Sequence, residues 1–196
     1  MTEKFVAPAM STRERILRAA AEAFADKGFY GTGMAEIGEL AQIQRGALYY
    51  HIGSKEELLY DLCRQHVDTA LANGRVAVST SDDARDQFRA LALAHLQTLM
   101  DRRPFVVIAE REMGALTGEW AIELNKLRRE YQDLFATVMA LGVDQGHFST
   151  AEPLEVMGVI GLLNYTYVWL RPSGPIPVEE VARRLCDLLM NGMSVR

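Results

Sequence analysis

The sequence predicts an all-α protein, with an N-terminal three-helix head that contains a helix-turn-helix and a C-terminal helical bundle. Three observations support this fold class. Apolar residues recur at three- and four-residue spacing, as on one face of a helix, through most of the 196 residues. Two serines stand three positions before a glutamate, a pattern that begins helices. The alternation of polar and apolar residues that is typical of strands is missing from the sequence.

Composition and charge exclude several classes of protein. The chain is 49% hydrophobic and 24% charged, which is typical of a globular protein and excludes wholesale disorder. Its two cysteines, Cys63 and Cys186, lie far apart, which excludes a disulfide framework and a zinc ribbon. The first residues lack the basic and apolar segments of a secretory signal. We therefore expect a cytoplasmic protein with no membrane partner, no metal and no cofactor.

Four helices are predicted in the first half of the chain. Residues 1–10 show no periodicity and are predicted to form a flexible tail. Capping boxes of the form S-x-x-E begin the first helix at Ser11 and the fourth at Ser54, and Gly28 ends the first. The second and third helices are short. The expected ranges are about 11–27, 34–41, 45–50 and 54–77.

Further helices follow in the second half, at about 83–100, 105–116, 120–143 and 156–170, with a last one after the proline-rich break that ends at Pro177. The helix at 120–143 carries a heptad-like apolar seam, which indicates packing in a bundle. That seam consists of Leu124, Leu127, Tyr131, Leu134, Val138 and Leu141.

The uncharged helix at 156–170 is apolar around its whole circumference, so we expect it to be buried on all sides. At 15 residues it is shorter than the roughly 20 that cross a bilayer. It can be a central core helix, or its outer face and the last helix can form a two-fold dimer interface. Gly158 and Gly161 would let another backbone approach closely. We expect a homodimer through the last two helices.

Residues 32–55 carry the pattern of a helix-turn-helix. Ile37, Ala41, Ile43 and Leu48 fit two short helices that cross a three-residue turn, and Gly38 supplies a small residue where they approach. In such a motif the second helix lies in the major groove of DNA, where arginine pairs with guanine and glutamine with adenine. Other polar side chains suit phosphate oxygens. The predicted DNA contacts are Thr32, Gln44, Arg45, Gly46, Ala47, Tyr49, Tyr50, His51 and Lys55.

Residues 13–62 resemble the DNA-binding head of TetR-type (tetracycline-repressor-like) transcriptional regulators. The resemblance rests on RERILRAAAEAFADKG, T-x-M-x-x-I, R-G-A-L-Y-Y-H-I and S-K-E-E-L-L. It implies a repressor that a small lipophilic effector releases from palindromic double-stranded operator DNA. The expected division is a tail at 1–10, a DNA-binding domain at 11–55 and a ligand-binding and dimerisation domain at 56–196.

The turn departs from the family pattern at two positions. Gln42 replaces a glycine that is expected to take a positive φ, which costs about 1 kcal/mol in another residue. Gln44 replaces a small hydroxyl residue that would cap the recognition helix. Both changes are compatible with the fold, but they alter the contacts that the family pattern implies.

The end of the chain, NYTYVWLRPSGPIPVEEVARRLCDLLMNG, is similar to a subgroup whose members often respond to acyl-CoA thioesters. An acyl-CoA is therefore one expected effector class. Arginine pairs at 102–103, 128–129 and 183–184 are candidate phosphate contacts, or they are solvated helix faces. The ligand contacts that we predict are His66, Met100, Met113, Tyr131, Asn164, Tyr167 and Trp169, several of which core packing also explains.

Charge leaves alternatives open. The formal charge of −5 divides into −1 over residues 1–60 and −4 over the rest, so the head is not basic as DNA-binding heads usually are. A drug-responsive regulator of an efflux pump, or a helical ligand-binding module without DNA affinity, also fits. No catalytic constellation stands out in the sequence, so an enzyme is disfavoured.

Overall fold

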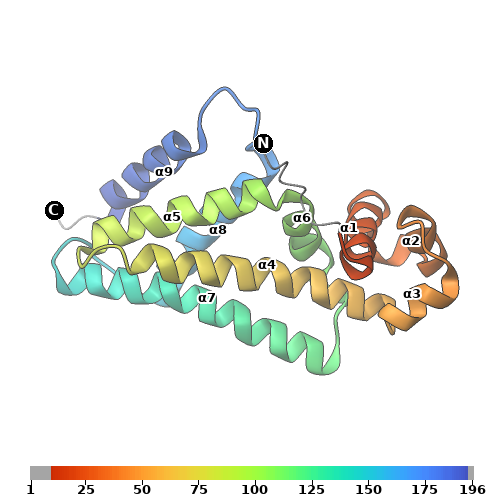
Figure 1. Cartoon of the computed structure of the whole chain (residues 1–196). Helices are drawn as coiled ribbons and strands as arrows, with labels where there is room; N and C mark the ends of the chain where they lie inside the picture. The colour runs from red at the N-terminus through yellow and green to blue at the C-terminus, as the bar shows by residue number, and fades with distance from the viewer. Residues whose placement is uncertain (1–9, 194–196) are drawn as a thin grey trace, which may run out of the picture.

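The computed structural model describes residues 10–193, so the predicted tail at 1–10 lies outside the described residues except for Met10. Within this range the fold is all helical and contains no strand, which confirms the predicted class (Figure 1). The helices are α1 (Thr12–Gly31), α2 (Met34–Leu40), α3 (Arg45–His51), α4 (Lys55–Val78), α5 (Ala84–Asp101), α6 (Arg103–Glu112), the 3-10 helix η1 (Met113–Ala115), α7 (Gly118–Asp144), α8 (Pro153–Trp169) and α9 (Val178–Met193).

The two predicted capping motifs begin the helices that frame the head. At α1 the box is complete, because Ser11 accepts the Glu14 N–H and the Glu14 carboxylate accepts the Ser11 N–H. At α4 Ser54 accepts the Glu57 N–H, but the Glu57 carboxylate accepts the N–H of Gly53 instead of Ser54. Each arrangement still satisfies backbone donors that the first helical turn leaves unpaired.

Gly28 ends the regular part of α1 as predicted, and a short helical segment follows it within the same element. Its backbone takes φ 76° and ψ 167°, and α1 continues beyond this kink to Gly31. Only glycine adopts this region readily. A Cβ atom at Gly28 would also lie 3.2 Å from a carboxylate oxygen of Glu112 at the end of α6. The kink is therefore a point of close contact between the head and the body.

Replacement of Gly28 by alanine should lower the free energy of unfolding by about 1–3 kcal/mol, because the new Cβ would be strained in this backbone region. Urea denaturation of the variant and the wild type would measure the loss. Gly33→Ala is the matched control, since Gly33 has a φ of −102° and open space at its Cβ position. Equal stability of the two variants would contradict the strain that we assign to Gly28.

The helix at the centre of the body is α5, which packs against α4, α7, α8 and α9. Its buried face includes Phe88, Leu91 and Leu96, each fully enclosed. Figure 1 shows α4, α5 and α7 running along the long axis of the molecule, while α1, α2 and α3 form the head at one end. Because α4 begins in the head and ends deep in the body, one rigid helix joins the two.

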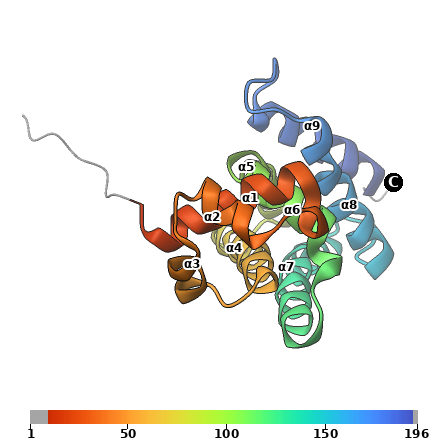
Figure 2. The same cartoon turned by 90° about the vertical axis from the view of Figure 1, so that its right-hand side faces the viewer.

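The prediction that the helix at 156–170 is buried on all sides is wrong for the single chain. Positions on one face of α8 are buried, but the opposite face is open, with Leu154 80% and Tyr165 64% exposed. Gly158 and Gly161 also face open space. On α9 Leu188 is 63% exposed. Figure 2 shows α8 and α9 along one side of the body.

Candidate functional site

The helix-turn-helix forms as the sequence predicts. The N–H of Ile43 donates to the carbonyl of Gly38 at 2.9 Å, which closes the turn between α2 and α3. A Cβ atom at Gly38 would lie 3.3 Å from the Ile43 carbonyl oxygen and 3.4 Å from a methyl group of Leu48. The small residue therefore permits the close crossing of α2 and α3.

Gln42 adopts the positive φ expected at its position, with a value of 56°. Arg15 reaches across from α1 and donates to the carbonyls of Ala41 and Gln42. This guanidinium stabilises backbone oxygens that the strained turn leaves without helical partners. A residue of the first helix thus fixes the angle at which the recognition helix begins.

Gln44 occupies the N-cap of α3 without a side-chain capping bond, which agrees with the loss of a small hydroxyl residue at this position. Its side chain is exposed, so it can reach a ligand outside the head. The short recognition helix is held instead by Leu48 and Ile52, both 1% exposed. These anchors set which face of α3 points outward.

The exposed face of α3 carries most of the predicted DNA contacts. Tyr50 is 86% exposed, and Tyr49 is 45% exposed with the guanidinium of Arg45 over its ring. His51 is half-buried and packs edge-on against Tyr50. The exposed members of the predicted set are Gln44, Arg45, Gly46, Ala47, Tyr49 and Tyr50.

Two predicted contacts have roles within the head. Thr32 is only 2% exposed, and its hydroxyl donates to the carbonyls of Ala23 and Gly28, so its side chain is not available to DNA and that prediction is wrong. Lys55 donates to the carbonyls of Phe29 and Thr32 at 2.9 and 3.0 Å. Two of its three N–H donors therefore join the start of α4 to the end of α1, and the third remains for a phosphate oxygen.

The charges of the head leave one cation free on this surface. Lys27 pairs with Glu36, and Arg15 and Lys55 donate to backbone carbonyls. Arg13 and Arg18 pair with Asp61 and Glu22. Among the described residues 10–60, Arg45 alone has neither a carboxylate nor a carbonyl partner. Although the head has no excess of positive charge, its recognition helix carries a single unpaired guanidinium.

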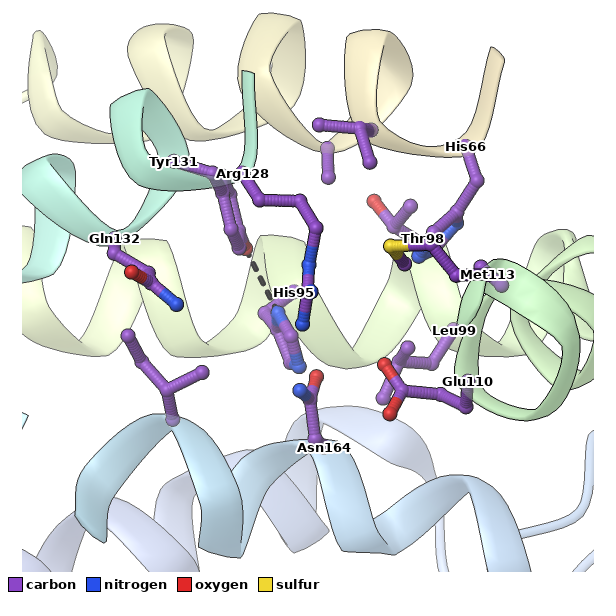
Figure 3. Close-up of a pocket in the computed structure, with 14 residues that line it drawn as sticks. His66, His95, Thr98, Leu99, Glu110, Met113, Arg128, Tyr131, Gln132 and Asn164 are labelled. Atoms are coloured by element: carbon purple, nitrogen blue, oxygen red, sulfur yellow. Dashed lines mark hydrogen bonds between the residues drawn. The ribbon is translucent and has the colours of Figure 1, made fainter. Parts of the chain in front are cut away.

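A cavity of about 50 Å³ lies in the body between α4, α5, α6, α7 and α8 (Figure 3). In Figure 3 the side chains of His66, His95, Arg128 and Asn164 come from four different helices and point into the same space. The lining residues are His66, Val67, Ala70, His95, Thr98, Leu99, Ala109, Glu110, Met113, Arg128, Tyr131, Gln132, Ile160 and Asn164.

Two histidines inside this cavity are kept neutral by their surroundings. Nδ1 of His95 hydrogen bonds with the Tyr131 hydroxyl at 2.7 Å, and the two rings are stacked. Burial, reinforced by nearby His66, lowers the pKa of His95 to about 3. Burial and the charge of Arg102 lower the pKa of His66 to about 4. The cavity is therefore polar yet carries no histidine charge near neutral pH.

Comparison with known proteins shows to which family this architecture belongs. Residues 16–62 match the family described as "Bacterial regulatory proteins, tetR family". Residues 81–193, more than half of the chain, match "Tetracyclin repressor-like, C-terminal domain". The chain belongs to the TetR family. It therefore contains the DNA-binding domain of a transcriptional regulator.

Individual TetR-family relatives span nearly the whole chain. The transcriptional activator FasR of Mycolicibacterium smegmatis is 37% identical over 189 residues, covering 95% of this chain and 85% of its own. The transcriptional repressor KstR2 of Rhodococcus jostii is 27% identical over 186 residues, covering 93% and 91%. The structure of AibR with isovaleryl coenzyme A and operator DNA has a TM-score of 0.81 at 24% identity, covering 92% of this chain and 98% of its own, and shows the same fold.

Four of the predicted ligand residues of this TetR-family chain line the cavity, and three do not. His66, Met113, Tyr131 and Asn164 meet there although they lie on different helices. Met100 lines a separate surface groove beside the proline-rich loop. Tyr167 packs against the core beyond the cavity, and Trp169 is 49% exposed on the outer face of α8. Trp169 stands five residues after Asn164 and therefore lies on another face of α8, whereas Tyr167, three residues after Asn164, lies about one turn further along the same side.

Sequence reasoning missed other cavity residues. His95 lies on the apolar face of α5 between Leu91 and Leu99. A histidine within an apolar stripe was therefore the sequence feature that could have indicated a cavity residue. Arg128 belonged to an arginine pair that suggested phosphate contacts, and it does line the cavity. By contrast Arg183 and Arg184 pair with Glu180 on their own helix, as solvated faces do. Arg103 donates to the Leu170 carbonyl.

Two further features of the described chain concern metals and membranes. Cys63, three residues before His66, is fully buried. Burial raises the pKa of its thiol to about 12. Both facts agree with core packing. Across residues 10–193 no group of three possible ligands gathers as a metal site. Within the same range, no helix combines the length and apolar character needed to span a bilayer.

Proposed function

We propose that this TetR-family protein is a homodimeric repressor whose two heads bind successive major grooves of a near-palindromic operator. The proposed DNA contacts are Gln44, Arg45, Gly46, Ala47, Tyr49, Tyr50, His51 and Lys55. A single observation carries the proposal: Arg45, the one unpaired cation of the described head, stands on the exposed face of α3. Arginine in this position reads guanine bidentately in the major groove.

Replacement of Arg45 by alanine should weaken binding of the preferred operator by about 1–3 kcal/mol, because a base-reading contact is removed. Binding to unrelated DNA should change less, so the ratio of specific to non-specific affinity should fall. Titration of fluorescent operator and scrambled duplexes at stated salt would measure both affinities.

Arg18→Ala is the matched control, because it removes a head cation that is already paired with Glu22 on the exposed side of α1. It should leave the specificity ratio unchanged. Equal losses on every duplex for Arg45→Ala would show that this residue contacts phosphate only. No operator binding by the wild type at low salt would favour the alternative of a ligand-binding module without DNA affinity.

The open face of α8 and α9 supports the dimer. Exposed apolar residues recur on α8 at helical spacing, and nothing else in the described chain covers them. A two-fold dimer uses the same patch on both subunits, so one exposed apolar face on each copy is enough to form its interface. The members of this dimer face are Leu154, Met157, Gly158, Gly161, Tyr165, Val168 and Trp169 on α8 and Leu188 on α9.

The cavity supports effector control. Sites for small ligands usually measure roughly 300–1,000 Å³, so a cavity of about 50 Å³ must open before an effector fits. Two of its walls, α4 and α6, also pack against α1 in the head. Opening of the cavity would therefore displace the heads, and an effector that binds the open state better would release the operator.

The effector class is a small lipophilic compound, with an acyl-CoA as the leading candidate. Arg128 lines the cavity without an ion-pair partner and can bind an acidic or phosphate oxygen. The tail resemblance implies the same class, and AibR, which shares the fold, was solved with isovaleryl coenzyme A. The second candidate effector is a drug, in which case the protein would regulate an efflux pump. Native mass spectrometry of a co-purified ligand would distinguish the two effector classes.

A further inference from the structure

Two nitrogen atoms inside the cavity lack hydrogen-bond partners in the described chain, namely Nδ1 of His66 and Nε2 of His95. His95 is only 5% exposed, and its Nδ1 is already engaged by Tyr131. Figure 3 shows the Asn164 side chain close to the other side of the His95 ring. A side-chain interaction with Asn164 raises the pKa of His95 against the larger lowering by burial, but Nε2 has no partner with normal hydrogen-bond geometry.

Two other buried polar groups of the wall, Thr98 and Tyr131, are already satisfied. The hydroxyl of Thr98 donates to the Ala94 carbonyl at 2.8 Å and accepts from the Asn73 amide at 2.9 Å. Tyr131 is paired with His95. Among the lining residues of the described chain, the buried side-chain atoms without a partner are therefore these two histidine nitrogens, on α4 and α5.

An effector that enters this cavity must replace the hydrogen bonds that water can make there. A cavity of about 50 Å³ has room for a few water molecules, and once it opens, water can bond to the two imidazole nitrogens that are buried in the closed state. Displacing such water by an apolar group leaves buried nitrogens unpaired, and displacing it by a matching polar group does not. The histidines thus discriminate between ligands by the chemistry of their buried end.

We propose that the effector carries a hydroxyl or carbonyl oxygen on the part that enters the cavity, where it hydrogen bonds to His66 and His95. This inference rests on the proposed function, because it names the ligand chemistry of the same site. A hydroxyl both donates and accepts, so it fits either tautomer of His95. A carbonyl fits the tautomer in which Tyr131 donates to Nδ1 and Nε2 carries the proton.

Calorimetry on the full-length protein without DNA tests the inference with two sets of probes. The first set compares octanoyl-coenzyme A with its 3-hydroxy, 3-oxo and 8-hydroxy derivatives. The second compares decanoate with 10-hydroxydecanoate and its other hydroxy isomers. In each set that binds, at least one oxygenated member should bind about tenfold more tightly than its unsubstituted parent.

The double variant His95→Phe with Tyr131→Phe removes both partners of one hydrogen bond and keeps the ring shapes, so it should fold. It should bind the unsubstituted probes and lose most of the preference for oxygen. Ile160→Val is the matched control, because Ile160 is an apolar member of the same wall. It should change the affinity for all probes alike and keep the preference.

Each outcome separates this inference from the proposed function. Preference for oxygen among the free acids, with no binding of the thioesters, would support the inference and remove acyl-CoA as the effector class. Equal binding within both sets, binding of no probe, or an unchanged preference in the double variant would overturn the inference. Operator binding and dimerisation, measured separately, would be unaffected by any of these results.

Discussion

Replacement of Gly161 by arginine should convert the proposed homodimer into a monomer. In the single chain Gly161 is exposed and its Cβ position meets nothing within 4 Å, so the variant should fold normally. In a two-fold interface the new guanidinium would be buried without a partner. Such an uncompensated charge costs about 3–5 kcal/mol, which corresponds to roughly a hundredfold or greater loss in dimer affinity.

Analytical ultracentrifugation would measure the change in mass, and operator titration would measure its consequence. Because two heads must bind together, operator affinity should fall with the dimer. Ile122→Arg is the matched control, since Ile122 is an exposed apolar residue of α7, 72% exposed and outside the dimer face. A Gly161→Arg variant that remained dimeric would place the interface elsewhere.

Acidification from about pH 7 to about pH 5 should destabilise the protein by on the order of 2 kcal/mol for each cavity histidine. The folded state holds the pKa of His66 at about 4 and that of His95 at about 3, against an ordinary value near 6.5. Protonation is therefore easier in the unfolded chain. The stabilisation is complete above about pH 6.5 and is lost as the pH falls through about 4 for His66 and about 3 for His95.

Urea denaturation at the two pH values would measure this effect. The groups that face the histidines are Arg102 beside His66, with Arg128 and Glu110 on other walls of the cavity. The double variant His95→Phe with Tyr131→Phe retains His66 alone, so it should lose about half of the pH dependence. The same free energy of unfolding at both pH values would contradict the burial that we assign to the two rings.

Local sequence rules were sufficient for the head. Ser11 and Ser54 begin their helices, and Gln42 takes the positive φ that its place in the turn requires. These features depend on a few neighbouring residues and on backbone sterics, both of which the sequence displays directly. The family resemblance then supplied the function of α3, which its residue types alone left open.

Features that depend on distant neighbours could be predicted only in part. Thr32 looks like a polar surface residue, but its hydroxyl lies inside the kink of α1. The apolar run of α8 predicted full burial, yet periodicity does not reveal whether a face is covered by the same chain or by another copy. The spacing of Asn164 and Trp169 places them on different faces of one helix, but which face meets the cavity depends on helices that pack from elsewhere in the chain, so the cavity could not be outlined fully.

The small size of the cavity has a consequence for how sensitively the regulator would respond. If the cavity opens only in a minor population, the apparent dissociation constant of the effector equals its intrinsic value divided by that population. Packing between α4, α6 and α7 would then set the concentration at which genes are induced. Substitutions such as Ala109→Gly, in a buried wall residue, could shift the induction threshold without altering the effector's own contacts.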